Sequence, residues 1–163
     1  MYRRERLACR LADVVLMDTS AHCQFMAQLY RLPLEKFKRL FVGSDLPDYF
    51  GQRPLPQKPS GKLLCHFHGG YSPFQGVDVI LRAAKRLANQ PVHFHLIGAG
   101  QEYATMRKLA DELSVRNVSF IEPVDYPTLA AYHQIADIGL GVFGKTETGL
   151  RPVIPNKVQE GLA

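Results

Sequence analysis

The fold is decided by residues 62–100, which read KLLCHFHGGYSPFQGVDVILRAAKRLANQPVHFHLIGAG. Two short apolar runs, 62–67 and 92–97, have the length of buried strands, and between them apolar residues recur at helical spacing over 77–88. Two strands joined by a helix in this order form a right-handed crossover in a parallel sheet. This stretch therefore predicts an α/β fold.

The same alternation continues downstream. The sequence predicts helices over residues 102–113 and 127–136, strands over 118–121 and 138–143, and a last helix that begins near Lys157. The expected fold class is α/β, a Rossmann-like parallel sheet flanked by helices.

The first 50 residues predict a smaller unit of the same kind. They predict a helix over 3–12, a strand over 13–17, a helix over 21–30 and a strand over 38–42. Two strands are too few for a stable doubly covered sheet, so we expect this unit to belong to a larger domain. The proline-rich segment 51–61 predicts a linker between residues 1–50 and the main domain, 62–163.

The composition limits the partners and the compartment. With 163 residues and 46% hydrophobic residues the chain can build a core, and its net charge of +5 favours an anionic partner such as a phosphorylated small molecule, nucleic acid or an acidic membrane. Aromatic residues are not interleaved with basic ones, so we do not expect nucleic acid. No apolar run approaches the roughly 18 residues of a membrane span, so any membrane contact would be peripheral. Three cysteines without metal-type spacing fit a reducing cytoplasm, with the inner face of the membrane as an alternative.

Ligands of parallel sheets bind beyond the carboxyl ends of the strands. Two loops at this edge begin with glycine, Gly69-Gly70 and Gly98-Ala99-Gly100, and would let backbone come close to a ligand. Tight turning is the alternative explanation for either loop. Because Tyr103 stands where the third glycine of a dinucleotide fingerprint belongs, a dehydrogenase is weakly supported.

A third loop, from Gly144, carries Lys145 and Arg151 and leads into the helix start at Lys157. Unpaired N–H groups and a lysine at a helix start can hold a phosphate. A solvated lysine on an exposed turn is the alternative. Glu160 is well placed for the helix dipole.

Two histidine pairs occupy strands, His66 with His68 and His93 with His95. Alternate strand residues share a face, so four imidazoles would approach one another if these strands are neighbours. A metal site is one hypothesis, but neither carboxylates nor cysteines cluster with the pairs, and we predict no metal. Only His68 is expected at the ligand rim.

The order of several segments resembles a known family. They read ADVVLMDTSAH (12–22), FVGSD (41–45), HFHGGYSPFQGVDVILRAAKRL (66–87), HFHLIGAGQ (93–101), NVSFIEPVDYPTLAAYHQIADIGLGVFG (117–144) and IPNKVQEGLA (154–163). Together they resemble glycosyltransferases of the GT-B fold, in particular glycosyltransferase family 4, also called group 1. The resemblance implies a fragment that joins the end of an acceptor-binding domain to most of the donor domain.

The resemblance also implies an activity. A sugar would be transferred with retention from a nucleoside diphosphate sugar, the co-substrate, to an unknown glycan or lipid-linked acceptor, without a cofactor. The matched donor-binding positions are Gly69, Gly70, Tyr71, Gly100, Val124, Asn156, Lys157 and Glu160, and the catalytic residues are Lys145 and Glu160. In this pattern Glu160 contacts the ribose, and the glycine turn approaches the diphosphate.

Three positions depart from the family pattern. Tyr71 and Gln75 replace an arginine and a lysine that neutralise the diphosphate in many members, and Pro152 replaces the first of two paired glutamates. Lys145 or Arg151 would supply the missing charge. The alternative is a nucleotide-binding module without transfer activity.

Overall fold

The computed structural model describes residues 2–144 and 154–162 of the chain. The chain divides into two compact units. The amino-terminal unit comprises Met1–Gly43 with Leu150–Ile154, and the sheet unit comprises Ser44–Gly149 with Pro155–Ala163. In the described part of the chain, none of the helices combines the length and apolar character needed to cross a bilayer.

The amino-terminal unit is a small α/β unit in which two parallel strands, β1 and β2, pair. Its elements in chain order are α1 (Tyr2–Leu11), β1 (Val15–Met17), α2 (Ser20–Tyr30), the 3-10 turn η1 (Leu34–Lys36) and β2 (Phe37–Arg39). The side chain of Thr19 caps α2 by accepting a hydrogen bond from the amide of His22 (2.9 Å).

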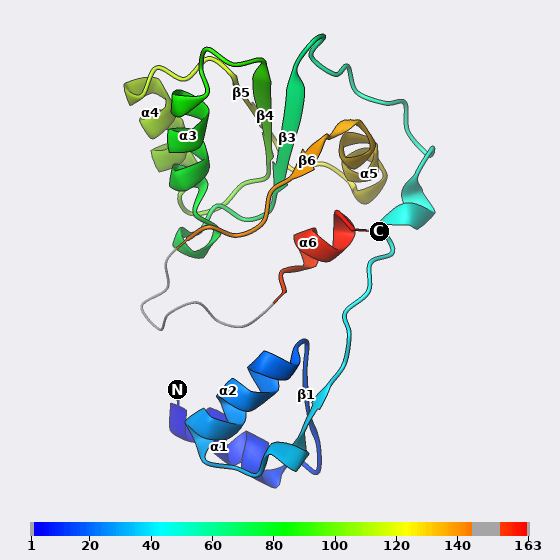
Figure 1. Cartoon of the computed structure of the whole chain (residues 1–163), viewed down its shortest axis with the longest axis vertical. Coiled ribbons are helices and arrows are strands. Elements are labelled where there is room, and N and C mark those ends of the chain that lie inside the picture. The colour runs from blue at the N-terminus through cyan, green and yellow to red at the C-terminus, as the bar shows by residue number, and fades with distance from the viewer. Residues whose placement is uncertain (1, 145–153, 163) are drawn as a thin grey trace. The chain divides into compact units, whose positions relative to one another are not determined.

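The sheet unit carries a four-stranded parallel sheet in the order β5-β4-β3-β6 (Figure 1). Its elements are η2 (Leu46–Tyr49), β3 (Leu63–His68), η3 (Pro73–Gln75), α3 (Val77–Arg86), β4 (Val92–Ile97), α4 (Tyr103–Glu112), β5 (Val118–Ile121), α5 (Tyr126–Ile135), β6 (Ile138–Gly139) and α6 (Asn156–Glu160). The α/β class with a parallel sheet, predicted from the sequence, is confirmed.

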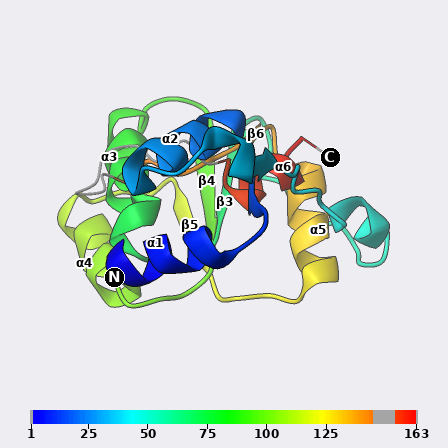
Figure 2. The same ribbon diagram turned by 90° about the horizontal axis from the view of Figure 1, so that it is seen from below.

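The two faces of this sheet are covered differently. Helices α3 and α4 lie against one face and α5 against the other (Figure 1 and Figure 2). The main core fills the α3–α4 face and consists of Cys65, Phe67, Tyr71, Val77, Ile80, Leu81, Ala84, Phe94, Leu96, Met106 and Ala110. Side chains alternate along β3, so Cys65 and Phe67 join this core while His66 faces α5.

The last strand is shorter than the sequence predicted. Only Ile138–Gly139 pairs with β3, and the amide of Leu140 still donates to the carbonyl of His66 (2.8 Å). The amide of Phe143 instead donates to the carbonyl of Gln75 (3.1 Å), so the chain leaves the sheet toward η3. The predicted strand over 138–143 is thus wrong beyond its first residues.

The proline-rich segment 51–61 has no helix or strand, and ion pairs attach it to the sheet unit. Arg53 pairs with Asp125 (3.0 Å) and Lys58 pairs with Asp137 (2.7 Å). Asp137 also accepts a hydrogen bond from the amide of Leu64 (2.8 Å), which ties the start of β6 to β3.

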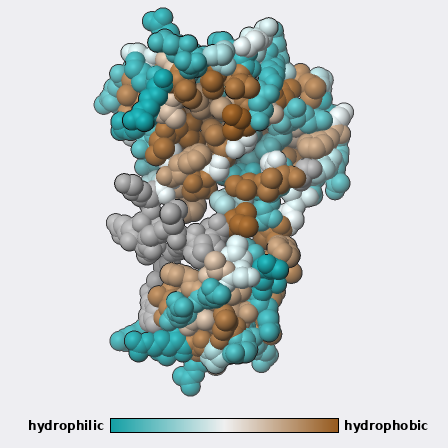
Figure 3. Space-filling model, viewed as in Figure 1, coloured by the Kyte–Doolittle hydropathy of each residue, from teal (hydrophilic) through white to brown (hydrophobic). Residues whose placement is uncertain are grey.

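Hydrophobic side chains remain visible on the surface of the sheet unit (Figure 3).

We expect Leu81→Ala to lower the free energy of unfolding by about 2–5 kcal/mol, because it removes a fully buried side chain of α3 and leaves a cavity. Val79→Ala, on the exposed side of the same helix, should change it by less than about 0.5 kcal/mol. Urea denaturation followed by circular dichroism measures both. Equal losses in the two variants would contradict the assigned faces of α3.

Candidate functional site

The loops that follow β3 and β4 are joined by backbone hydrogen bonds at the carboxyl edge of the sheet. The amide of Gly69 donates to the carbonyl of Ile97 (3.0 Å), and the amide of Tyr71 donates to the carbonyl of Ala99 (2.9 Å). The pairing of β3 with β4 therefore extends past both strand ends. It brings the two glycine loops of the sequence side by side.

The glycines of these loops have different neighbours. Gly100 has φ +156°, and a Cβ there would lie 2.5 Å from the backbone nitrogen of Tyr71. Gly69 has φ +142°, and a Cβ there would lie 2.9 Å from Nζ of Lys157. Packing between the loops thus accounts for Gly100, whereas Gly69 leaves room for a charged side chain.

Lys157, on α6, is half-buried beside the loop that follows β3. Its ammonium group donates a hydrogen bond to the side-chain oxygen of Gln75 and lies 4.0 Å from the ring centroid of Phe67. Burial lowers the pKa of Lys157 to about 8, although the nearby carboxylate of Glu160 acts in the opposite direction. The site therefore holds a cation that is largely stripped of water.

Glu160, one turn further along α6, is held at both carboxylate oxygens. Its Oε2 lies 2.6 Å from Nε2 of His68, and its Oε1 accepts a hydrogen bond from the hydroxyl of Tyr126 (2.7 Å). The side chains of His68 and Glu160 are 14% and 10% exposed. The hydrogen bond to Glu160 raises the pKa of Tyr126 to about 12. Glu160 is therefore a positioned, largely buried carboxylate at the carboxyl edge of the sheet.

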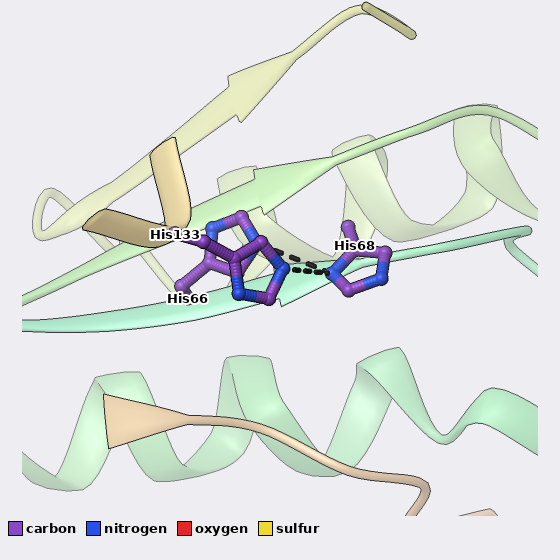
Figure 4. Close-up of side chains that lie close together, drawn as sticks. All are labelled: His66, His68 and His133. Atoms are coloured by element: carbon purple, nitrogen blue, oxygen red, sulfur yellow. Dashed lines mark hydrogen bonds between the residues drawn. The ribbon is translucent and has the colours of Figure 1, made fainter. Parts of the chain in front are cut away.

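Behind Glu160 lies a cluster of three imidazoles, His66, His68 and His133 (Figure 4). Nδ1 of His68 lies 3.2 Å from Nε2 of His66 and 3.1 Å from Nε2 of His133. Burial lowers the pKa of His66 to about 2 and that of His133 to about 4, and repulsion from His133 adds to the first shift and repulsion from His68 to the second. The imidazoles of His66 and His133 are therefore neutral near pH 7.

The sequence did not identify His133 as a member of this cluster. The signal was present, because His133 follows the buried Leu129 by four residues on α5, and residues at this spacing share a helix face. The second predicted pair lies on the neighbouring strand β4, where His95 is the register partner of His66. His93 lies 2.8 Å from the hydroxyl of Ser119, and the ring of His95 packs edge-on against Tyr132.

The other predicted site residues have different surroundings. Tyr71 needs a correction: its side chain is 1% exposed and lies in the core, so only its backbone borders the loop. Val124 is half-buried just before α5, and Asn156 is exposed at the first position of α6. Gly70 lies in the turn after Gly69. Lys145, which was predicted to be catalytic, falls outside the described residues, as do Arg151 and Pro152.

The expected anion site at a helix start receives little support from the helix itself. Helix α6 begins at Asn156 and has five residues, and no side chain caps its first turn. A helix this short has only a small dipole. The charges of Lys157 and Glu160 therefore matter more than the helix end.

A family model matches this chain. It is described as glycosyl transferases group 1 and matches residues 52–140. A putative colanic acid biosynthesis glycosyl transferase, WcaI, from Escherichia coli K12 is 29% identical over 105 residues, which cover 64% of this chain and 25% of that protein. The chain thus spans about a quarter of the length of this curated relative.

Solved structures share the fold. HepE from Anabaena, in complex with UDP-glucose, aligns over 99% of this chain and 45% of its own, with a TM-score of 0.75 and 18% identity. WaaG, a glycosyltransferase involved in lipopolysaccharide biosynthesis, aligns over 80% of this chain and 38% of its own, with a TM-score of 0.62 and 21% identity.

We expect Gly100→Ala to lower the free energy of unfolding by roughly 2–6 kcal/mol, since backbone strain and overpacking against Tyr71 each cost about 1–3 kcal/mol. Gly139→Ala is the matched control, because no heavy atom lies within 4 Å of its Cβ position. It should change stability by less than about 1 kcal/mol. Thermal unfolding compares the two, and a tolerated Gly100→Ala would mean that the two loops do not pack as described.

Proposed function

The chain belongs to the group 1 glycosyl transferases, and from this membership we propose that its sheet unit binds the nucleoside diphosphate sugar donor of a glycosyltransferase. The observation that carries the proposal is the position of α6. This helix brings a half-buried ammonium group, Lys157, and a largely buried carboxylate, Glu160, to the carboxyl edge of the sheet. Ligands of open parallel sheets bind at this edge.

The two charges match the two halves of a nucleoside diphosphate. A carboxylate accepts hydrogen bonds from the hydroxyls of a ribose, and we assign this role to Glu160. An ammonium group pairs with phosphate oxygens, and we assign this role to Lys157, with the backbone amide of Gly70 beside it. Tyr126 and His68 already hold the carboxylate of Glu160 in place, so little ordering remains to be done when the donor binds.

The same charges would serve the transfer step. When the bond between the sugar and the diphosphate breaks, negative charge grows on the leaving diphosphate, and a fixed cation stabilises it. Burial makes Lys157 effective in this role, because a cation acts more strongly where water is excluded. We propose Lys145 as a second cation for the same phosphates, transfer with retention of configuration, and a glycan or lipid-linked acceptor.

A second candidate is a nucleotide-binding module without transfer activity. It is favoured by the core position of the Tyr71 side chain and by the neutral Gln75, which bonds to Lys157 where many relatives would place a basic residue. Assaying donor hydrolysis separates the two functions. Turnover supports the transferase, whereas binding of the donor without turnover supports the module.

The compartment and the remaining partners are part of the same proposal. The described structure leaves Cys9, Cys23 and Cys65 as free thiols, in keeping with a reducing cytoplasm. We propose that the enzyme works there or at the inner face of the membrane, without nucleic acid as a partner and with the donor as co-substrate in place of a cofactor.

We expect calorimetric titration with UDP, GDP and ADP to show binding of at least one diphosphate. Glu160→Gln and Lys157→Met should each weaken that binding by about 10- to 150-fold, the cost of losing a hydrogen bond to a charged group. UDP is the first nucleotide to test, because HepE was solved with UDP-glucose.

Lys108→Met and Glu112→Gln provide matched controls for this titration. These residues form an exposed lysine–glutamate pair on α4, and their removal should leave nucleotide affinity unchanged. The proposal fails if the α4 variants weaken binding as much as the α6 variants, or if none of the three nucleotides binds.

The affinity for UDP should also depend on pH. Lys157 has a pKa of about 8 in the free protein, and a bound diphosphate would raise it by favouring the charged form. Affinity should therefore be highest below pH 8 and fall by up to about tenfold per pH unit above it. Repeating the titration between pH 7 and 9.5 measures this fall, and Lys157→Met should remove it. A flat profile for the unsubstituted protein would exclude a phosphate contact by Lys157.

A further inference from the structure

We propose that His66, His68 and His133 form a binding site for a zinc-class transition-metal dication. The three residues come from two elements that the fold presses together: β3 supplies His66 and His68, and α5 supplies His133. The site lies on the α5 face of the sheet, behind the proposed donor site. The proposal does not depend on the glycosyltransferase function.

The geometry of the three rings suits one ion. One ring nitrogen from each residue lies within 4.8 Å of the other two, and two of the separations are 3.1 and 3.2 Å. Zinc bound tetrahedrally at about 2.0–2.1 Å from each nitrogen requires about 3.3 Å between ligand nitrogens. His66 and His133 both direct a ring nitrogen at Nδ1 of His68 (Figure 4), so two of the three nitrogen separations already match the spacing around one ion.

Hydrogen bonding alone leaves this cluster poorly satisfied. When Nε2–H of His68 donates to Glu160, Nδ1 of the neutral ring has one lone pair, yet two imidazole nitrogens face it. Nε2 is the atom of His66 that faces His68, whereas Nδ1 of the same ring is buried without a hydrogen-bond partner among the described residues and would not contact the ion. A metal ion would use the three converging lone pairs together, which a single proton cannot do.

A carboxylate lies beside one of the three proposed ligands. Metal-binding histidines commonly donate their other ring N–H to a carboxylate, which fixes the ring and strengthens it as a ligand. Glu160 stands in this position to His68, at 2.6 Å. The ammonium group of Lys157 is nearby and opposes a second cation, and the charge of Glu160 offsets it.

The ligand set selects the class of metal. Imidazole nitrogens suit zinc, copper and nickel, whereas magnesium and calcium take oxygen ligands. Three protein ligands also leave a fourth tetrahedral position for water or another group. Zinc is therefore the metal that we expect.

Isothermal titration of the metal-free chain with Zn²⁺ tests the proposal. One ion should bind per chain. His66→Gln or His133→Gln should weaken zinc affinity by more than the roughly 10- to 100-fold that is lost when a group hydrogen-bonded to a ligand is removed. Glu160→Gln should weaken it by about 10- to 100-fold, which a site made only of surface groups would not show. His93→Gln, another imidazole of the same sheet unit, should leave zinc affinity unchanged.

Titration with Co²⁺ gives an independent readout, because visible absorption of bound cobalt reports its coordination by nitrogen ligands. Circular dichroism checks that each variant folds, and His133→Gln, on the half-buried ring, keeps the test valid if His66→Gln does not fold. Absence of zinc binding would overturn the proposal. Binding that survives both histidine variants would also overturn it, since the ion would then sit elsewhere, for example on the free cysteines.

Discussion

The parallel register between β3 and β4 is the constraint on which the sheet unit depends. It pairs Leu63 with Val92 and continues without a break to His68 and Ile97, and the backbone bonds beyond extend it into the two glycine loops. Because side chains alternate along a strand, a shift of one residue would turn the imidazoles of β3 into the α3–α4 core. The register therefore decides both where the loops meet and which face of the sheet carries polar groups.

The two faces of the sheet differ in packing and in polarity. The α3–α4 face is apolar and closely packed, so it supplies most of the stability, with Phe67 and Leu81 completely buried. The α5 face accepts imidazoles, and α6 adds an ammonium group and a carboxylate at its edge. Polar groups are costly to bury, and the ammonium group of Lys157 and the carboxylate of Glu160 are each held by another polar group. A closely packed apolar face and a polar face are thus built on the same four strands.

Much of the fold could be predicted from the sequence, because helical and strand periodicity depend on local spacing. The predicted bounds of β4 and β5 agree with the structure, and Lys157 and Glu160 were selected together. Contacts between distant elements could not be predicted in this way. The burial of Tyr71, the bond of Gln75 to Lys157 and the arrival of His133 beside His68 all depend on how loops and helices pack on the sheet. The early end of β6 has the same origin, since Phe143 bonds to a loop instead of a strand.

The contact between Gly100 and Tyr71 has an evolutionary consequence. The atoms that a side chain at position 100 would meet are the backbone nitrogen, oxygen and carbonyl carbon of Tyr71. A clash with a side chain can be relieved by a second mutation that makes the neighbour smaller, but every residue type has the same backbone. No substitution at position 71 can therefore relieve the clash that a side chain at position 100 would cause. Tyr71 can be replaced by other side chains that fill the core. Position 100 is expected to stay glycine as long as the two loops keep their pairing.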